Sequence, residues 1–195
     1  MIGEEERLLR DGALTILPTD TVYGIGCAAA HRDACARLYA CKSRPASQPT
    51  AIVAGSVAVM VEDALPDLPE RARALCRRVL PGPVTLIVPN PGRRFAHVCG
   101  DAPDRIGVRV PHLLPAVAAL ADAVGGLVLT SANARGGDPP ARLADVPAEL
   151  RAACAVIVDG GELAGMPSSV IDVTGPEPVL LRRGPDADSA VAALR

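Results

Sequence analysis

Apolar residues recur along the chain in two alternating patterns, short continuous runs and helical spacing at every third or fourth position. Short apolar runs bounded by turn residues predict strands, and helical spacing over about ten residues predicts helices. The runs predict strands at 13–17, at 22–28, at 50–54, within 81–89, and at 106–110, 127–130, 155–158, 170–173 and 179–181. Helical spacing predicts helices at 4–10, 33–42, 57–64, 70–80, 114–124, 147–153 and 186–194.

Strands and helices interleave in this order, which is typical of α/β proteins. Some predicted strands also follow one another directly, as 13–17 and 22–28 do, and this favours a mixed sheet over a purely parallel one. No internal repeat, low-complexity segment or linker interrupts the sequence. We therefore predict a single α/β domain over residues 1–195, with a twisted, mixed parallel and antiparallel sheet flanked by helices.

Composition narrows the classes of protein to which the chain can belong. With 49% apolar and 22% charged residues it is predicted to be globular rather than disordered. A net charge of −2 argues against a protein whose whole surface binds nucleic acid, although it leaves room for a local basic pocket. The acidic start Met1–Arg7 is no signal peptide, and no apolar run approaches the roughly 20 residues of a membrane span, so we expect a cytoplasmic protein.

The cysteines and histidines do not form a recognisable ligand motif. The six cysteines contain no C-x-x-C pair, and the three histidines are far apart in sequence. Cysteines in apolar surroundings without such spacing are typical of small buried side chains in a reducing compartment. We therefore expect no protein-bound metal site and no disulfide framework.

The stretch from Pro18 to Arg44 concentrates polar residues directly after the first predicted strand. Thr19, Thr21 and Tyr23 recur at every second position, so an extended backbone would place all three hydroxyls on one side. The glycines that follow allow a ligand to approach the backbone closely. This pattern indicates a site at the end of the first strand.

Lys42 is the one lysine among 20 basic residues. A compact ammonium group on a flexible stem reaches a phosphate as a point charge, which a planar guanidinium does not do in the same way. The alternative is that Lys42 is solvated at the end of its helix and interacts favourably with the helix dipole there. The residue alone leaves both interpretations open.

Further cations and hydroxyls follow or occupy later strands, where α/β folds place their ligand crevice. They comprise Arg105, Arg109, Ser131, Asn133, Ser168, Ser169, Arg182 and Arg183. Several cations gathered with hydroxyl and amide groups suggest a polyanionic ligand, such as the phosphates of a nucleotide. Arg109 lies within a predicted apolar strand, and a buried charge there requires a carboxylate or phosphate partner.

Several familiar catalytic motifs are missing from the sequence. It contains no G-x-x-x-x-G-K-[ST] phosphate loop, no G-x-G-x-x-G after a strand and no G-x-S-x-G. The chemistry is therefore expected to come from positioning and charge stabilisation rather than from a covalent nucleophile.

Taken together, these segments resemble the YrdC-like family of L-threonylcarbamoyladenylate synthases. The matching motifs occur in the family's order over nearly the whole chain: P-T-D-T-V-Y-G-I-G (18–26), K-S-R-P (42–45), P-G-P-V-T-L-I-V (81–88), I-G-V-R-V-P (106–111), T-S-A-N (130–133), S-S-V-I-D (168–172) and L-R-R-G (181–184). Each motif alone is weak, whereas seven in order make a specific match.

The resemblance implies a YrdC-like fold and a nucleotidyltransferase that condenses L-threonine, bicarbonate and ATP and releases pyrophosphate. The product, threonylcarbamoyl-AMP, would pass to a transferase complex that modifies an adenosine in certain tRNAs, and Mg²⁺ would accompany the nucleotide. The resemblance assigns Thr21, Arg109, Ser131 and Ser168 to threonine. It assigns Lys42, Arg44, Gln48, Arg105, Asn133 and Arg182 to ATP, with Lys42 and Arg44 as the catalytic pair.

Two other functions remain open at this level. The first is a module that binds double-stranded RNA or tRNA, for which arginines at 71, 73, 77 and 78 of one predicted helix would supply charge; on an amphipathic surface helix such charges are usually only solvated. The acidic net charge and the scarcity of aromatic residues argue against it. The second is a YrdC-like domain that transfers a carbamoyl group without threonine.

Overall fold

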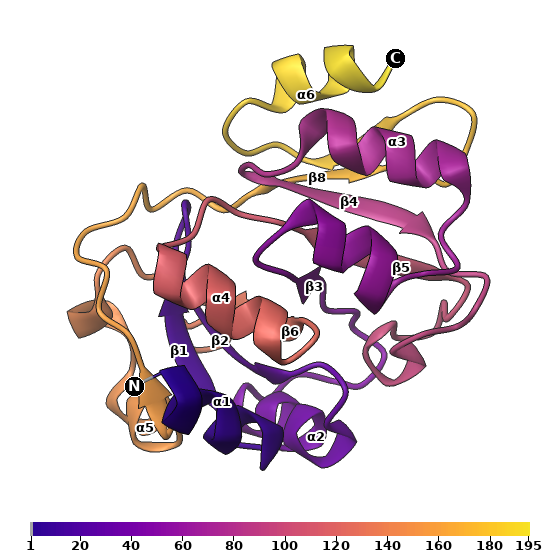
Figure 1. Ribbon diagram of the computed structural model, residues 1–195. Helices are drawn as coiled ribbons and strands as arrows, with labels where there is room; N and C mark the ends of the chain where they lie inside the picture. Colours follow the sequence, from indigo (N-terminus) through magenta and orange to yellow (C-terminus); the bar gives the residue numbers. More distant parts are fainter. Residues whose placement is uncertain (1) are drawn as a thin grey trace.

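Residues 2–195 are described by a computed structural model, in which nine strands of this part of the chain form one sheet (Figure 1). The strands are β1 (Thr15–Pro18), β2 (Tyr23–Ala28), β3 (Ile52–Val53), β4 (Val84–Pro89), β5 (Arg105–Arg109), β6 (Leu127–Ser131), β7 (Val156–Ile157), β8 (Ser169–Asp172) and β9 (Val179–Arg182). The helices are α1 (Ile2–Arg10), α2 (Arg32–Cys41), α3 (Glu70–Val79), α4 (Pro115–Ala123), α5 (Ala148–Ala152) and α6 (Ala187–Leu194). Shorter turns are the π-helix η1 (Val59–Ala64) and the 3-10 helices η2 (Ala96–Val98) and η3 (Leu143–Asp145). These elements lie within a few residues of the predicted ones, although the predicted helix at 57–64 is a π-helical turn.

The sheet mixes parallel and antiparallel pairs, as the sequence predicts. Its strand order is β7-β1-β2-β6-β3-β5-β4-β8-β9. The pairs β1–β7, β3–β5 and β4–β8 are parallel, whereas the remaining neighbours run antiparallel. The sequence neighbours β1–β2, β4–β5 and β8–β9 pair antiparallel, and so do β2–β6 and β3–β6, which helices separate in the chain. Each parallel pair is also separated in sequence by at least one helix.

One face of the sheet carries the main core. Cross-strand partners form a continuous row over six strands, and each member is fully buried: Cys27, Val128, Ile52, Val108, Leu86 and Ile171. Apolar residues of α2, α3 and α6 pack on this face, and Leu38, Leu75 and Leu194 are among them. Burial of such side chains is the main favourable term in folding.

The opposite face of the sheet divides into a covered end and an open end. At the covered end, Leu17 and Leu127 pack with α1 and α4 in a second apolar cluster. At the other end, the outward positions of β4 and β5 include the small or polar residues Thr85, Gly107 and Arg109, beside the apolar Ile87. Because side chains alternate along a strand, these residues face away from the main core and leave room for a ligand.

The connection between β1 and β2 does not have the extended backbone that would align the three hydroxyls. Residues 19–22 form a turn rather than an extended strand, because the Thr19 hydroxyl accepts hydrogen bonds from the backbone N–H groups of Thr21 and Val22. The three hydroxyls therefore do not share one side. Tyr23 is fully buried, and its hydroxyl contacts Asp159 and the segment after it.

The cysteines are free thiols throughout residues 2–195. Cys27 and Cys35 lie closest together, with their sulfur atoms 3.6 Å apart, and their hydrogen bond raises the pKa of Cys27 and lowers that of Cys35. No group of three or more potential metal-ligating side chains occurs in this part of the chain. None of the helices within residues 2–195 has the length and apolarity required to cross a membrane.

Candidate functional site

A cavity of about 400 Å³ lies over the open end of the sheet, which is within the usual size of a small-molecule site. Its floor is formed by Ala51, Gly107 and neighbouring strand residues. Its polar wall includes Arg44, Gln48, Thr85, Arg105, Arg109, Ser131, Ser168 and Arg182. Among the described residues that line it there are four arginines and no aspartate or glutamate, so the cavity favours an anionic ligand.

Arg109 is held at the cavity by a carboxylate from the β1–β2 turn. Its Nη2 atom donates to Asp20 Oδ1 at 2.5 Å and to Thr21 Oγ1 at 2.7 Å. Asp20 Oδ2 in turn accepts a hydrogen bond from the backbone N–H of His112 at 3.0 Å. The partner that a buried arginine requires is thus supplied within the chain. Within residues 2–195 the buried Nε atom of Arg109 has no hydrogen-bond partner.

The hydrogens of the Thr19 and Thr21 hydroxyls can be assigned from their partners. Thr19 donates its one hydroxyl hydrogen to the carbonyl oxygen of Val22 at 2.7 Å. The 3.0 Å contact between the two hydroxyls therefore has Thr21 as its donor. Since Thr21 also accepts from Arg109, its hydroxyl is directed to protein groups, and it orients the guanidinium rather than lining the cavity.

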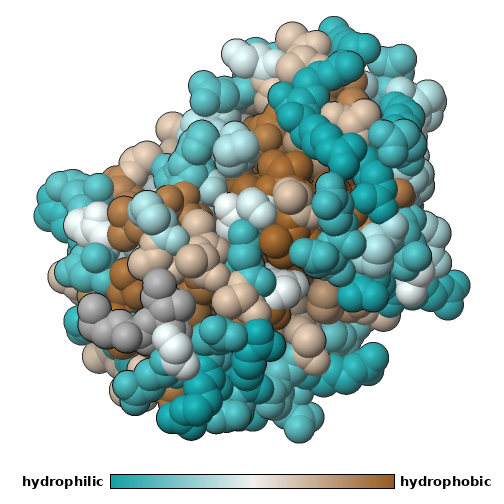
Figure 2. Space-filling model, viewed as in Figure 1, coloured by the Kyte–Doolittle hydropathy of each residue, from teal (hydrophilic) through white to brown (hydrophobic). Residues whose placement is uncertain are grey.

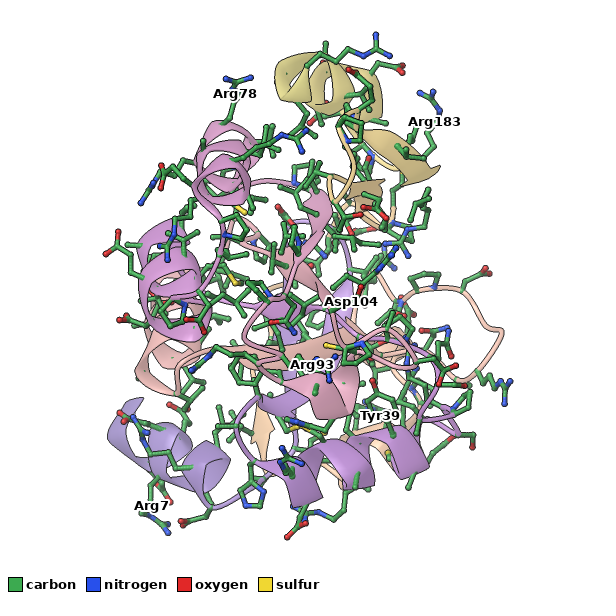
Figure 3. The ribbon with its side chains drawn as sticks, turned by 90° about the vertical axis from the view of Figure 1, so that its right-hand side faces the viewer. Arg7, Tyr39, Arg78, Arg93, Asp104 and Arg183 are labelled. Atoms are coloured by element: carbon green, nitrogen blue, oxygen red, sulfur yellow. The ribbon has the colours of Figure 1, made fainter. Side chains whose placement is uncertain are left out.

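Arg182 and Ser168 form a second polar group on the cavity wall. The Nε atom of Arg182 donates to the backbone carbonyl of Ser168 at 2.9 Å, and Nη2 donates to its hydroxyl at 3.1 Å. The same hydroxyl lies 2.9 Å from the hydroxyl of Thr85. Arg183, the next residue, points outward instead and pairs with Asp188 (Figure 3).

The two guanidinium groups lie in the same electrostatic environment. Burial lowers the pKa of Arg109, the charge of Asp20 opposes this, and the nearby charge of Arg182 lowers it further. Burial also lowers the pKa of Arg182. Asp20 pairs with Arg109, whereas Arg182 forms no ion pair among the described residues. The two like charges therefore create a positive potential in the cavity, and a bound anion would offset their desolvation.

Lys42 joins the end of α2 to the loop that follows β6. Its ammonium group donates to the backbone carbonyl of Asn133 and lies 3.5 Å from the side-chain oxygen of the same residue. Ser131 donates to that side-chain oxygen at 2.5 Å. Burial, together with the charge of Arg44, lowers the pKa of Lys42 to about 8. Lys42 is therefore a buried cation whose charge is lost slightly above neutral pH.

Arg44 and Arg105 differ in how firmly they are held. Arg44 donates to the carbonyl oxygens of Gln48 and Pro49, and its guanidinium carbon lies 5.8 Å from the centre of the Tyr39 ring, a side chain labelled on α2 in Figure 3. Arg105 is 47% exposed and approaches Asp172 at 3.5 Å. An exposed pair of this kind contributes little stability, so Arg105 is free to reorient towards a ligand.

Most of the residues predicted from the sequence meet at this cavity. Those that line it are Arg44, Gln48, Arg105, Arg109, Ser131, Ser168 and Arg182. Thr21, Lys42 and Asn133 are not among the lining residues. Thr21 contacts Arg109 and Asn133 contacts Ser131, both of which line the cavity, whereas Lys42 contacts Asn133. The geometry brings the predicted residues together, while their individual roles stay predictions.

Sequence reasoning missed Asp20 and Thr85. Asp20 lies inside the P-T-D-T motif, and an acid beside two threonines after a strand is the signal that could have identified it. Thr85 is the single polar residue in the apolar run Val84–Val88, which is a comparable signal for a functional hydroxyl in a strand.

The arginines of α3 are not a free basic surface. Arg73 donates to three backbone carbonyls, those of Leu68, Val61 and Pro66, and Arg71 donates to the carbonyls of Gly175 and Pro176. Arg78, at the outer side of α3 in Figure 3, donates to Ala193. Figure 2 shows hydrophilic residues on the face over α3. Most of the arginines of this helix, however, donate hydrogen bonds to neighbouring backbone carbonyl oxygens. This arrangement does not favour the RNA-binding alternative.

Comparisons with known proteins identify relatives of this chain. The model of the Sua5/YciO/YrdC family, described as telomere recombination, matches residues 7–184. A threonylcarbamoyl-AMP synthase of Pyrococcus abyssi is 34% identical over 90% of this chain and 52% of its own length. One from Chromohalobacter salexigens is 36% identical over 90% of this chain and 94% of its own length.

The fold has a close counterpart among solved structures. The crystal structure of Pyrococcus abyssi Sua5 complexed with L-threonine superposes with a TM-score of 0.80 at 31% identity, covering all of this chain and 58% of the other. The chain spans about half the length of the first curated relatives it matches.

Proposed function

The chain belongs to the Sua5/YciO/YrdC family, and we propose that it is an L-threonylcarbamoyladenylate synthase. In this reaction L-threonine, bicarbonate and ATP give threonylcarbamoyl-AMP and pyrophosphate. Support comes from relatives named threonylcarbamoyl-AMP synthase, one of which has nearly the same length as this chain. Further support comes from the related Sua5 structure that contains L-threonine.

The observation that carries the proposal is the pair Arg109 and Arg182 in one cavity. Both guanidiniums are desolvated, Asp20 pairs with Arg109 but not with Arg182, and no carboxylate among the described residues lines the cavity. Such a cavity requires an anion, and both the carboxylate of threonine and the phosphates of ATP meet that requirement. A volume of about 400 Å³ is sufficient for the reacting groups of both substrates.

The residues divide into an amino-acid end and a nucleotide end. At the amino-acid end Arg109 would bind the threonine carboxylate, held in place by Asp20 and Thr21, while Ser131 and Ser168 would hydrogen-bond the polar groups of threonine. Because Arg109 uses Nη2 for the protein, its Nη1 atom, which has no hydrogen bond within residues 2–195, would be available to the ligand. A pocket that hydrogen-bonds a hydroxyl rejects analogues without one far better than an apolar pocket does.

At the nucleotide end the proposed ATP contacts are Arg44, Gln48, Arg105, Asn133 and Arg182, with Lys42 adding charge near the phosphates. Lys42 and Asn133 are already joined through the hydrogen bond between the ammonium group and the carbonyl oxygen. This contact would fix the loop after β6 against the end of α2, so that the cations are placed before ATP binds. Preorganised charges of this kind stabilise a transition state without reorganising during the reaction.

The chemistry consists of two condensations. The threonine amine first adds to bicarbonate and loses water, which gives a carbamate. A carbamate oxygen then attacks the α-phosphorus of ATP, a new P–O bond forms, and the bond to pyrophosphate breaks. Charge accumulates on the phosphate oxygens in this step, so cations and positioning supply the catalysis without a covalent nucleophile.

Magnesium would enter as part of the nucleotide substrate. The lining residues described here offer arginine, hydroxyl and amide groups but no carboxylate, which is the ligand that Mg²⁺ prefers in proteins. The phosphate oxygens of ATP would therefore hold the ion. We further propose that the protein works in the cytoplasm, where its product would be taken up by a tRNA-modifying transferase complex.

Omission of single substrates tests the proposed function. Release of pyrophosphate should require L-threonine, bicarbonate and ATP together, and Lys42→Ala and Arg44→Ala should abolish it while the circular dichroism spectrum stays native. Release without threonine would instead favour carbamoyl transfer without an amino acid. RNA affinity that falls steeply with salt, in the absence of ATP turnover, would favour the RNA-binding alternative.

A further inference from the structure

Thr85 and Ser168 form a buried pair of hydroxyls on the cavity wall. Thr85 projects from β4, Ser168 directly precedes β8, and their oxygen atoms are 2.9 Å apart. The two residues are only 8% and 3% exposed, yet both line the cavity. The pair therefore lies at the boundary between the protein interior and a bound ligand.

A count of hydrogens shows that this pair has one donor left over. Each hydroxyl carries one hydrogen, and only one hydrogen can lie between the two oxygens. Ser168 Oγ also accepts from Arg182 Nη2, so that contact uses no hydroxyl hydrogen. Within residues 2–195 neither oxygen has another hydrogen-bond partner. In either orientation, one O–H group remains without a protein acceptor.

The hydroxyl pair of the β1–β2 turn behaves differently. Thr19 donates to Val22, and Thr21 donates to Thr19, so both hydrogens are directed to protein oxygens. The turn pair orients Arg109 but has no donor for a ligand, whereas the Thr85–Ser168 pair does.

We propose that Thr85 and Ser168 act as one donor unit, in which Ser168 accepts from Arg182 and donates to Thr85 while the Thr85 O–H binds an anionic oxygen of the substrate, which makes Thr85 a further substrate-binding residue. The inference rests on the proposed function. Arg182 contacts Ser168 directly, and its charge acts on Arg109, so the free O–H lies where the cavity attracts negative charge. The oxygen belongs either to the carboxylate of threonine or to a phosphate of ATP.

The Thr85 hydroxyl is accessible from the cavity floor, and its orientation is restricted. Gly107, on the neighbouring strand β5, has no side chain, and a Cβ atom there would lie 3.7 Å from the Thr85 methyl group. The floor beside Thr85 therefore stays open to a ligand. Threonine is stiff at χ1, so its oxygen keeps one orientation relative to β4. A serine at this position would keep the donor but lose part of that restraint.

Isosteric substitution tests the donor unit. The dissociation constants of L-threonine and of ATP are measured separately by calorimetry for Thr85→Val, Thr85→Ser and Ser168→Ala. Loss of a hydrogen bond to a charged group weakens binding by about tenfold or more, so Thr85→Val should weaken one substrate to that extent. Thr85→Ser should stay within about threefold of the wild type. The substrate that is weakened identifies the source of the oxygen.

Two features separate binding from a structural role. Thr15→Val is the matched control, because Thr15 is a fully buried threonine outside the cavity whose hydroxyl has no hydrogen-bond partner among residues 2–195. It should leave both dissociation constants unchanged. Since one O–H serves the ligand, Thr85→Val/Ser168→Ala should lose no more affinity than the larger of the two single losses.

The proposal is overturned if Thr85→Val binds both substrates as tightly as the wild type, or if the two losses add. If turnover by the wild type does not require all three substrates together, this contradicts the proposed function but not the donor unit. In that case the same variants are titrated with pyrophosphate, and equal affinity of wild type and Thr85→Val for this anion overturns the donor unit itself.

Discussion

The ammonium group of Lys42 donates a hydrogen bond to the backbone carbonyl oxygen of Asn133, a residue 91 positions later in the chain. This contact joins the end of α2 to the loop after β6. It also removes the ammonium from water, which together with the charge of Arg44 lowers the pKa of Lys42 to about 8. One hydrogen bond thus links the geometry of the site to its dependence on pH.

ATP affinity should therefore fall as the pH rises through about 8. Below this pKa Lys42 carries its charge, and above it the charged fraction declines to about one tenth by pH 9, so the apparent dissociation constant should rise up to about tenfold. Lys42→Arg should abolish this fall, because arginine keeps its charge over the whole range. Calorimetric titration between pH 7 and about 9.5 measures both profiles. A flat wild-type profile, or the same fall in Lys42→Arg, would exclude Lys42 from phosphate binding.

Arg109 and Asp20 should be strongly coupled in stability and in threonine binding. Their side chains are 11% and 12% exposed, and removal of one partner of a buried ion pair costs about 3 kcal/mol. Arg109→Met should lower the free energy of unfolding by about that amount. Asp20→Asn/Arg109→Met should recover part of the loss while threonine binding stays absent. Urea unfolding of the wild type, the two single variants and the double variant measures this coupling, and strictly additive losses of unfolding free energy would show that the pair is not coupled.

The outcome for Arg109 shows what the sequence can and cannot predict. A charged residue in an apolar strand predicts a partner from its burial alone, but the sequence does not identify Asp20, which lies 89 positions earlier. Element boundaries and the mixed sheet follow from local patterns. The order of nine strands does not, since it depends on which buried faces meet.

The turn at residues 19–22 has a local cause. The alternating hydroxyls would share one side only on an extended backbone, whereas the Thr19 hydroxyl accepts hydrogen bonds from the N–H groups of Thr21 and Val22 and so stabilises a turn. A side chain that hydrogen-bonds to nearby backbone N–H groups in this way can prevent the extended backbone that an alternating pattern would suit. The same turn places Asp20 and Thr21 beside Arg109, so the residue that breaks the strand pattern also builds the site.

Enlarging Gly107 should block the cavity without unfolding the protein. A Cβ atom at this position would lie 3.2 Å from the Cβ atom of Ala51, which is tight but short of a severe clash. Gly107→Ala should weaken substrate binding, and Gly107→Val should abolish it, with native circular dichroism in both. Gly175→Ala is the control, because its Cβ atom would have only one distant neighbour, the carbonyl oxygen of Glu177 at 3.9 Å. Unchanged turnover in Gly107→Val would place the substrates elsewhere.

Arg73 should contribute to stability and not to RNA binding. Its guanidinium donates to three carbonyl oxygens around η1 and the start of α3, so Arg73→Ala should lower the free energy of unfolding by about 2 kcal/mol. Arg7→Ala is the control; it removes an exposed pair with Asp11 and should cost less than about 0.5 kcal/mol. An Arg73→Ala protein of normal stability that had lost affinity for RNA would contradict this account.

The identity of the product tests the central claim most directly. The protein is incubated with L-threonine, ATP and ¹³C-labelled bicarbonate, and the adenylates are identified by mass spectrometry. The account predicts threonylcarbamoyl-AMP that carries the labelled carbon, formed together with pyrophosphate. An adenylate of threonine without the label, or ATP cleavage without any adenylate, would contradict it.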